Sequence, residues 1–452
     1  MKIIVGGAGS VVQSIVTYLA QVNNDIIVID TDAKKLDDLA QTADIRPIRG
    51  SIAHPDILEK AGAKSADMLI AVTNSDECNM IACQISYSLF NLPHRIARID
   101  NDAYLSPLWS TLFNENNIPV DLIISPAKEI ALAIQRLLKI PGCCEYIPFF
   151  DNKLYLLAFR CNQHCPLLHT PLEQINMIFP DFEASFLSIE RGDKNFIPSQ
   201  TDTLQCGDIV NFLVNKDKID DAIHAFGMEK PVIERVIIFG GSSIARNLAH
   251  NLESDDAIIN IKIIDENSNS ARILAKELNR TIVINGKMLN DAILEEATID
   301  RADVSIALTE NDKDNLLISL LAHSKGSSSV ISLVNSLNSI NLWKNVGENI
   351  LVHRASVTMS RLLRDIRSNR IAFAQSLGSG KGEIWVVEID ENSKISEHKI
   401  SSLRLSSNIK IGAILRNDII IYPKQNELIH LGDKLIVYTN SNQIRRAEQI
   451  FS

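Results

Sequence analysis

The sequence predicts an α/β protein with two tandem Rossmann-like, doubly wound parallel-sheet domains, each followed by a small α+β domain. Short runs rich in valine and isoleucine alternate with amphipathic segments, which is typical of a parallel sheet covered on both faces. A glycine-rich turn follows the first strand pattern at Gly7 and again at Gly240. The order of segments then repeats, which indicates a tandem duplication.

Three unrelated landmarks support the duplication. They recur after 233, 235 and 236 positions: Gly7 and Gly240, Asp30 and Asp265, Thr73 and Thr309. Such a nearly constant spacing is the signature of an internal repeat. We therefore expect four domains, at 1–124, 144–228, 232–354 and 371–452.

The elements of the first half follow from apolar periodicity. Strands are predicted at Lys2–Val5, Ile26–Ile29, Arg46–Ile48, Met68–Val72 and Ile96–Ile99. Helices are predicted at Ser10–Ala20, Ala33–Ala40, Asp56–Ala61 and Cys78–Phe90. A further helix begins at Ser125-Pro126, because serine caps and proline suits the first helical position, and it ends before Pro141-Gly142. Three strands then predict an antiparallel sheet, at Leu154–Phe159, Ala184–Ile189 and Ile209–Val214.

The second half predicts the same order. Its parallel strands are expected at Val236–Phe239, Ile261–Ile264, Thr281–Ile284, Val304–Ala307 and Val330–Leu333. A basic amphipathic helix is expected over about Ser356–Arg370, and a second antiparallel module has strands at Ile384–Ile389, Ile419–Tyr422 and Lys434–Tyr438. Tight turns at Gly207-Asp208 and Gly432-Asp433 occupy matching places in the two modules.

Composition excludes several classes of protein. The net charge of −10 argues against a nucleic-acid partner and against direct binding to an anionic membrane. No apolar stretch approaches the roughly 18 residues of a spanning helix, so we expect a cytoplasmic protein without membrane insertion. The seven cysteines, all before Gly207, are expected to be reduced thiols. The run Cys161-Asn-Gln-His-Cys165 is either a zinc-ligand fragment or an incidental loop, and no second ligand pair follows it.

The first glycine loop suits a nucleotide. Gly7 permits a tight turn, and Gly9 lets the backbone approach a pyrophosphate at the helix N-terminus. Asp30 lies where a carboxylate accepts hydrogen bonds from ribose hydroxyls, which favours NAD or an adenosine nucleotide over NADP. Val12 replaces the third glycine of the fingerprint and alters helix–strand packing. A Rossmann core that has lost its ligand is the alternative.

Further polar residues follow the next strands. Thr73 and Asn74 are placed to bind a ribose or base, and Arg98 is placed to pair with a phosphate. Asp76, Glu77 and Asn79 are instead expected to cap the following helix. The second copy departs further from the pattern, with Ser242, Ala245 and Leu333 in place of Gly9, Val12 and Arg98, while Asp265 and Thr309 remain. Nucleotide binding there is expected to be weaker.

The chain resembles the TrkA family, the cytoplasmic regulatory subunits of bacterial Trk potassium uptake. The most specific stretches run from Ala66 through Asn79-Met80 and Phe90 to Arg95-Ile-Ala-Arg-Ile99. The resemblance implies that each half is an RCK (KTN) nucleotide-binding domain followed by an RCK C-terminal domain. It implies binding of NAD(H) and of ATP or ADP.

The resemblance also implies the site and the partners. The nucleotide contacts fall on Gly7, Ala8, Gly9, Ser10, Val11, Asp30, Ser51, Thr73, Asn74 and Arg98, with Gly240, Gly241, Ser242, Asp265 and Thr309 in the second half. The implied partners are a membrane-embedded Trk-type potassium channel subunit and further copies of the chain, as a homodimer or tetramer. The protein would then lie on the cytoplasmic face of the inner membrane, and rearrangement of an RCK ring would control potassium flow.

Two other classes of function remain open on the residues alone. An NAD-dependent oxidoreductase needs an acid or base near the nicotinamide, and the histidines of this chain form no catalytic pattern. We therefore expect no enzyme. A ligand-free assembly scaffold is favoured by the departures at Val12, Ser242 and Leu333 and opposed by Gly7, Gly9 and Asp30. The helices after each Rossmann segment serve either assembly or ordinary packing within the chain.

Overall fold

A computed structural model describes residues 1–21, 24–140, 142–228, 232–336, 343, 349–366, 371–377 and 381–451. The chain divides into two compact units. The first unit comprises Met1–Glu129 together with Val357–Asp365, and the second comprises Ile130–Ser356 together with Ile366–Ser452.

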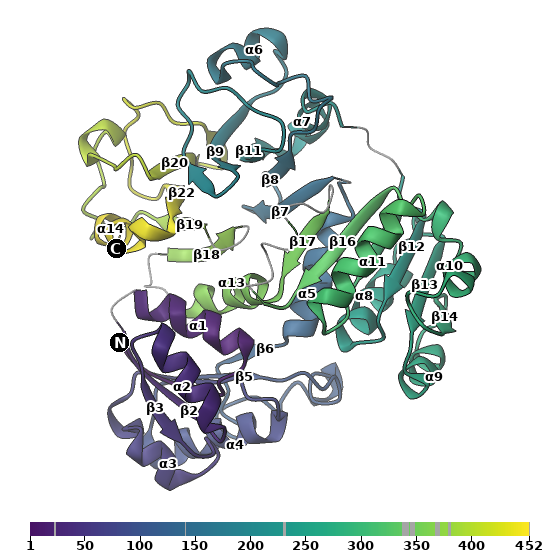
Figure 1. Cartoon of the computed structure of the whole chain (residues 1–452). Coiled ribbons are helices and arrows are strands. Elements are labelled where there is room, and N and C mark those ends of the chain that lie inside the picture. Colours follow the sequence, from purple (N-terminus) through teal and green to yellow (C-terminus); the bar gives the residue numbers. More distant parts are fainter. Residues whose placement is uncertain are drawn as a thin grey trace. The chain divides into compact units, whose positions relative to one another are not determined.

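The first unit contains a parallel sheet with strand order β3-β2-β1-β4-β5-β6 (Figure 1). Its strands are β1 Lys2–Gly6, β2 Asp25–Asp30, β3 Arg46–Arg49, β4 Met68–Ala71, β5 His94–Arg98 and β6 Leu122–Ile124. Its helices are α1 Ser10–Gln21, α2 Ala33–Thr42, α3 Pro55–Lys60 and α4 Asp76–Phe90. The order is that of a doubly wound Rossmann sheet, so the predicted fold class is confirmed. Strand β6 was not predicted, because three residues carry too little periodicity.

The second unit contains a matching parallel sheet with order β14-β13-β12-β15-β16-β17. Its strands are β12 Arg235–Phe239, β13 Asn260–Asp265, β14 Ile282–Asn285, β15 Val304–Ala307, β16 Ser329–Val334 and β17 Ile350–His353. Its helices are α8 Ser243–Glu253, α9 Ser268–Glu277, α10 Asp291–Ala297 and α11 Asp312–Ser324. The central strands are buried throughout, which explains their continuous valine and isoleucine runs.

Two antiparallel sheets complete the second unit, with orders β10-β9-β11-β8-β7 and β18-β19-β22-β20-β21. The first has β7 Cys143–Phe149, β8 Leu154–Arg160, β9 Ala184–Arg191, β10 Lys194–Phe196 and β11 Ile209–Asn215, with α6 Ile175–Ile178 and α7 Ile219–Ala225. The second has β18 Ile371–Leu377, β19 Gly382–Glu388, β20 Ile409–Arg416, β21 Ile419–Ile421 and β22 Lys434–Asn440, with α14 Ile444–Phe451. Read from opposite edges, the two strand orders are the same.

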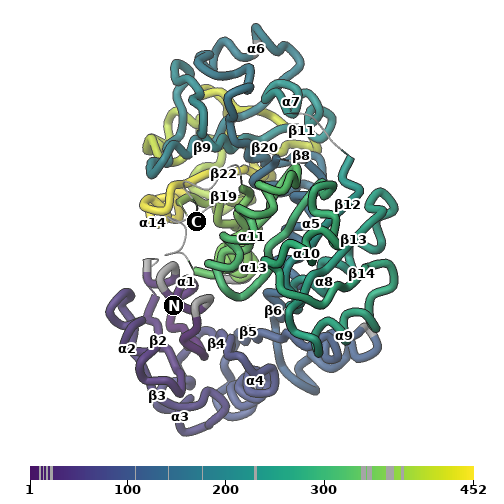
Figure 2. The backbone as a smooth tube through the Cα atoms, turned by 45° about the vertical axis from the view of Figure 1, so that its right-hand side comes forward, coloured from purple at the N-terminus to yellow at the C-terminus, as the bar shows by residue number. Residues whose placement is uncertain are grey.

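The two antiparallel modules pack against each other in both views (Figures 1 and 2). One buried cluster contains Leu187 and Leu213 of the first module and Ile436 of the second. Gly412 of β20 lies so close that a Cβ atom there would meet Leu187 Cδ2 at 2.4 Å. Asn195 Nδ2 donates to the hydroxyl of buried Tyr438 over 2.9 Å. The small domains of the two halves therefore share one core.

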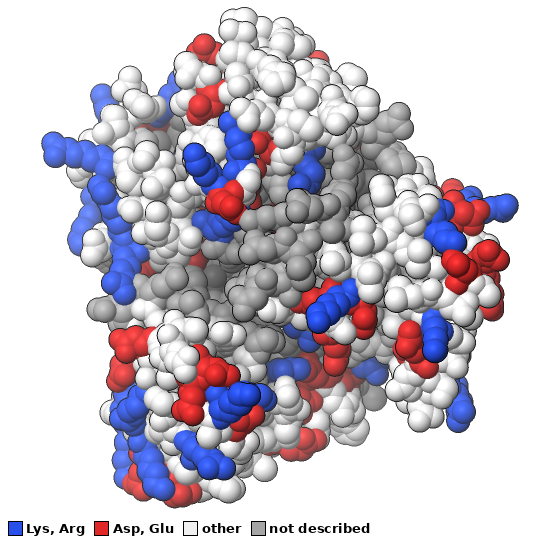
Figure 3. Space-filling view, viewed as in Figure 1, with Lys and Arg blue, Asp and Glu red and all other residues white. Residues whose placement is uncertain are grey.

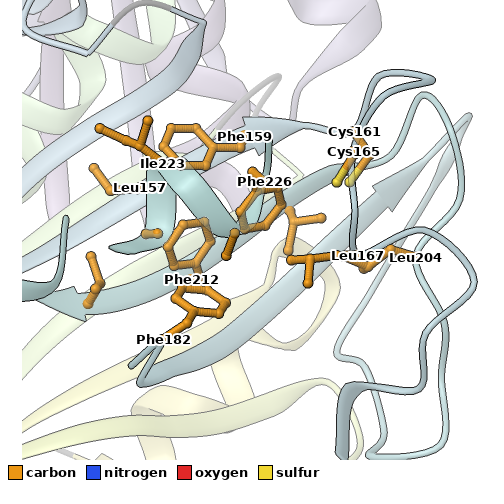
Figure 4. Close-up of a cluster of buried hydrophobic side chains, with 14 of the residues drawn as sticks. Leu157, Phe159, Cys161, Cys165, Leu167, Phe182, Leu204, Phe212, Ile223 and Phe226 are labelled. Atoms are coloured by element: carbon orange, nitrogen blue, oxygen red, sulfur yellow. The ribbon is translucent and has the colours of Figure 1, made fainter. Parts of the chain in front are cut away.

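The first module also has a core of its own. Phe159, Phe182, Phe212 and Phe226 interlock there, and Figure 4 shows the rings in contact. Phe159 meets Phe226 edge-on with 5.2 Å between ring centroids, and Phe212 stacks on Phe226 at the same separation. Such aromatic pairs add to the free energy gained from burial alone.

Two helices follow the parallel sheets, α5 Pro126–Leu137 and α13 Arg354–Ile366. The predicted helix over 356–370 is thus found up to 366, and residues 367–370 lie outside the described residues. The segment Val357–Asp365 belongs to the first compact unit, where Arg361 Nε lies 3.6 Å from Glu129 Oε1. Leu362 is fully buried. The described part of α13 therefore packs within the chain at Leu362.

Candidate nucleotide-binding site

Five candidate residues lie at one edge of the first sheet. Asp30 and Arg98 end strands β2 and β5, while Gly7, Ser51 and Thr73 follow β1, β3 and β4 directly or within two residues. Because the strands are parallel, all five lie at the carboxyl edge. Ligands bind at this edge in open α/β sheets, next to the point where the strand order reverses, here between β1 and β4.

The glycine loop joins β1 to α1. Gly7 has a φ of +106°, and a Cβ atom there would lie 3.1 Å from Val72 O, so the loop requires glycine at this position. A Cβ atom on Gly9 would meet no atom within 4 Å. Ser10 begins α1 and Val11 follows it. The backbone before the helix is therefore accessible to a phosphate group, which the helix N-terminus favours.

Asp30 is connected directly to this loop. Its Oδ2 accepts a hydrogen bond from Ala8 N over 2.6 Å, and its Oδ1 accepts one from Asp32 N over 2.8 Å. The residue is half-buried. A nucleotide ribose at Asp30 would therefore share the carboxylate with the loop backbone.

A buried asparagine joins the ends of β4 and β5. Asn79 Oδ1 accepts from both Thr73 N and Thr73 Oγ1, over 3.0 and 2.7 Å. Its Nδ2 donates to Thr73 O and to Arg98 O, over 3.2 and 2.9 Å. Asn79 is fully buried, so this set of bonds fixes two of the strand ends that form the site.

The prediction that Asp76 and Asn79 cap helix α4 is wrong. Ser75 is the N-cap, because its Oγ accepts from Cys78 N over 3.2 Å. Asp76 instead accepts from the backbone N–H groups of Asp100 and Asn101. The sequence contained one signal for these roles, because an asparagine and an aspartate recur at Asn315 and Asp312 with the spacing of the repeat.

Arg98 is already paired at the edge of the site. Its Nε donates to Asp100 Oδ2 over 2.7 Å, and its Nη1 donates to Asn74 Oδ1 over 3.2 Å. The side chain is 22% exposed. A phosphate at Arg98 would therefore compete with Asp100 or join the pair on its exposed side.

Ser51 lies beside the first turn of α4, which also contains Glu77. Ser51 Oγ accepts from Ala53 N over 3.3 Å and lies 3.9 Å from Cys78 Sγ. The pKa of the Glu77 carboxyl is lowered by hydrogen bonds from its own backbone N–H, from the Ser75 hydroxyl and from the Tyr104 hydroxyl. Glu77 therefore carries a negative charge in the first turn of α4, where the helix N-terminus favours it.

The second glycine loop is arranged differently. Gly240 keeps a φ of +98°, but the Ser242 side chain stands where Gly9 leaves open space and caps α8 by accepting from Ala245 N over 3.4 Å. Asp265 is 7% exposed, and its Oδ2 has no hydrogen-bond partner among the described residues. A Cβ atom on Gly241 would meet that oxygen at 2.1 Å. The loop thus lies directly on the carboxylate that would bind a ribose.

The second half nevertheless repeats the hydrogen bonds that Asn79 forms in the first half. Asn315 accepts from Thr309 N and Oγ1, and its Nδ2 donates to Thr309 O and Leu333 O. Asn315 is also fully buried. The duplication has therefore kept the frame of the site in both halves and changed the glycine loop.

Cys161 and Cys165 lie side by side in the aromatic core of the first antiparallel module (Figure 4). They are 0% and 4% exposed. A hydrogen bond with Cys165, together with burial, raises the pKa of the Cys161 thiol. Across the described residues, no group of three or more His, Cys, Asp or Glu side chains is placed to hold a metal ion.

Charge and hydropathy of the surface add two observations. Basic and acidic side chains are interspersed over both parallel-sheet domains on the face drawn in Figure 3. On this face, the two parallel-sheet domains therefore carry no one-sided basic stripe of the kind found in nucleic-acid binders. Among the described helices, none combines the length and hydropathy that crossing a membrane requires.

Comparison with known proteins gives the family. The TrkA-N domain model matches residues 3–126 and 236–354, and the TrkA-C domain model matches residues 386–452. The Trk system potassium uptake protein TrkA of Azorhizobium caulinodans is 34% identical over 451 residues, which cover 100% of this chain and 98% of that protein.

Two solved structures share the fold. The GsuK RCK domain aligns with a TM-score of 0.63 at 18% identity, over 100% of this chain and 94% of that one. The GsuK channel bound to NAD aligns with a TM-score of 0.62 at 18% identity, over 100% of this chain and 78% of that one. The predicted pair of RCK-type halves is confirmed. The relative's name is that of a potassium uptake protein, which agrees with the expectation that the chain is not an enzyme. The chain belongs to the TrkA family of Trk system potassium uptake proteins.

Proposed function

We propose that the chain is a cytoplasmic nucleotide sensor that regulates a membrane-embedded Trk-type potassium channel subunit. The name of its relative supports a role in potassium uptake, and the NAD-bound GsuK structure supports a nucleotide ligand for this fold. The observation that carries the proposal is the placement of Gly7, Asp30, Thr73 and Arg98 at one edge of the first sheet, together with the open backbone at Gly9.

The ligand is NAD(H), with ATP or ADP as a second nucleotide at the same edge. Its pyrophosphate would lie on the N-terminus of α1, bounded by Ala8, Gly9, Ser10 and Val11. The Asp30 carboxylate would accept the ribose hydroxyls and would repel a 2′-phosphate. Ser51, Thr73, Asn74 and Arg98 form the rest of the rim. The loop at Gly240, Gly241 and Ser242, with Asp265 and Thr309, is the weaker site.

Ligand binding has a direct route to conformational change. Asp30 holds Ala8 N, and Arg98 is paired with Asp100. A nucleotide that takes up either group changes the bonds that position the loop and the end of β5. A ligand shifts an equilibrium only by binding two states differently, and these exchanged bonds supply such a difference.

The regulated assembly contains further copies of this chain, as a homodimer or tetramer, in an RCK ring on the cytoplasmic face of the inner membrane. Nucleotide-driven rearrangement of the ring would open or close the channel. Attachment to the membrane would come from the channel subunit, since the net charge of −10 opposes direct binding to anionic lipid.

The test is a calorimetric titration of the full chain with NAD, NADH, ATP, ADP and NADP. We expect saturable binding of the first four, and binding of NADP weaker by about tenfold or more. Asp30→Ala should abolish binding at the stronger site, while Asp265→Ala is the matched control in the second half. Equal binding by wild type and Asp30→Ala would exclude the first loop as the sensor.

A measurement of potassium flux tests the proposed regulation of the channel. Vesicles that contain the channel subunit and the wild-type chain should show a potassium flux that depends on the nucleotide. In vesicles with Asp30→Ala, the flux should be the same with and without nucleotide. Failure of every nucleotide to bind would favour the scaffold alternative, for which the self-capped loop at Ser242 is the structural support.

A further inference from the structure

A pocket of about 280 Å³ lies inside the second compact unit, between the first antiparallel module and the second parallel sheet. Arg160 and Asn162 line it from the antiparallel module, and Asp303, Ser329 and Asn349 line it from the sheet. Val304, Ser329 and Ile350 are at the amino ends of their strands. The pocket is therefore on the opposite edge of the sheet from the nucleotide loop.

The first half of the chain shows why the pocket exists. There, Arg95 is the second residue of β5 and is only 4% exposed. Its guanidinium donates to Leu92 O, Pro119 O and Asp121 Oδ1, over 2.7, 2.9 and 2.7 Å. The arginine thus fills the amino edge of the first sheet with a side chain whose three nitrogens each donate a hydrogen bond.

In the second half, Val330 occupies the register position of Arg95, because each pairs with the second residue of the preceding central strand. Asn349 likewise takes the place of Asp121, directly before the last strand. The shorter valine removes both the volume and the charge of the arginine. Both replacement residues line the pocket.

A cation from another domain now faces this space. Arg160 ends β8 and is partly exposed. Burial raises the pKa of the Glu190 carboxyl, and the positive charge of Arg160 helps to oppose this larger effect. Glu190, on the far side of β11, is paired with Lys381, whose Nζ lies 3.5 Å from Glu190 Oε2. A guanidinium at a pocket wall is suited to bind a planar carboxylate through two parallel hydrogen bonds.

The rest of the lining limits the charge and size of a ligand. Asp303 is acidic, but its Oδ2 already accepts from the backbone N–H groups of Glu234 and Arg235. The lining contains one arginine, one aspartate and one histidine, His323, and the arginine beside the aspartate favours a singly charged head group over a phosphate dianion. Met228 and Val330 add apolar wall. The volume is at the lower end of ligand sites, which suits a small molecule and excludes a dinucleotide.

We propose that this pocket binds a small organic monocarboxylate, with its head group on Arg160 and its apolar part against Val330 and Met228. Such a ligand bridges the antiparallel module and the second parallel sheet. It stabilises their packed arrangement by mass action and gives the protein a second effector input, separate from the nucleotide edge.

The test is a calorimetric and thermal-shift titration of the full chain with acetate, butyrate and benzoate, with inorganic phosphate as the dianionic comparison. We expect at least one carboxylate to bind and to raise the melting temperature, and phosphate to bind more weakly. Arg160→Gln should weaken carboxylate binding by about tenfold or more, the loss expected for a charge-assisted hydrogen bond. Arg301→Gln, which changes an exposed arginine outside the pocket, is the matched control.

A second variant keeps the test independent of Arg160. The double change Val330→Arg and Asn349→Asp rebuilds the arginine and aspartate pair of the first half and should fill the pocket, abolishing carboxylate binding in a protein that still melts cooperatively. Asp30→Ala should leave carboxylate binding intact, which separates this pocket from the proposed nucleotide function. Carboxylate binding that survives Arg160→Gln, phosphate binding tighter than every carboxylate, or no carboxylate binding at all would overturn the proposal.

Discussion

A hydrogen bond between Ala8 and Asp30 joins the glycine loop of the first candidate site to the end of strand β2. The Asp30 Oδ2 to Ala8 N distance is 2.6 Å, so the carboxylate that we propose as the ribose contact also holds the glycine loop. The corresponding Asp265 Oδ2 has no partner among the described residues and lies against Gly241. The two halves therefore share the buried asparagine at the strand ends and differ in how the glycine loop contacts the aspartate.

This difference predicts the result of exchanging one residue between the loops. Gly9→Ser should weaken nucleotide binding by about tenfold, because a serine at this position caps the helix as Ser242 does and competes with the phosphate. The fold should tolerate the change, since a Cβ atom there meets nothing within 4 Å. Calorimetry measures the affinity, with Gly9→Ala as the control that adds a Cβ without a hydroxyl. Equal affinities for the serine and alanine variants would contradict the capping argument.

The buried hydrogen bonds of Asn79 predict a loss of stability when this residue is replaced. Asn79→Ala should lower the free energy of unfolding of the first unit by about 3 kcal/mol, because Thr73 N and Arg98 O lose their buried partner. Urea unfolding monitored by circular dichroism measures this change. Asn315→Ala is the matched variant of the second half, and a comparable loss is expected there. If Asn79→Ala unfolds like the wild type, water has replaced the bonds.

The tight turns of the antiparallel modules carry a repeated ion pair. Arg191 Nε and Nη2 donate to Asp208 Oδ1 and Oδ2 over 2.9 and 2.7 Å, and Asp208 is 1% exposed. Arg191→Gln should destabilise the protein by about 3 kcal/mol, because it leaves a buried carboxylate without its cation. Thermal unfolding measures the loss, and Arg191→Gln combined with Asp208→Asn should recover part of it. No recovery in the double variant would show that the arginine acts through packing alone.

Arg416 and Asp433 repeat this geometry in the second module, with 2.9 Å from Nε to Oδ1 and 2.8 Å from Nη2 to Oδ2. The predicted glycine turns are confirmed, with φ values of +89° at Gly207 and +86° at Gly432. The role of each following aspartate needed the fold, because its arginine partner is on another strand.

His353 predicts a pH dependence. Burial lowers the pKa of His353 from 6.5 to about 4, against a smaller opposing effect of Asp312. Between these values the unfolded state binds the proton more readily, so the stability of the second unit should fall as the pH drops from 6.5 towards 4. The full loss is about 3 kcal/mol. Melting temperatures measured over this range should depend less on pH in His353→Gln, and identical pH profiles would contradict the assignment.

The sequence alone determined the doubled α/β architecture, the positions of the central strands along the chain and the first glycine loop. These features rest on local periodicity, on glycine at Gly7 and on the spacing to Asp30, all of which are properties of neighbouring residues in the chain. It was much less informative about edge strands. The short strands β6 and β10 lack a clear period, and the edge strands β7 and β18 were not predicted although each pairs with the strand that follows it directly in the chain.

Only the tertiary structure decided what the polar side chains do. Asn79 resembled a helix-capping residue in the sequence and instead joins two strand ends, because Arg98 O comes within 2.9 Å only after the sheet has formed. Val330 was read only as part of a buried strand, yet the pocket beside it depends on Arg160 from a different domain. The physical reason is the same in both cases: a hydrogen-bond partner or a cavity wall is set by residues distant in the chain, whereas periodicity and turn chemistry are set by adjacent ones.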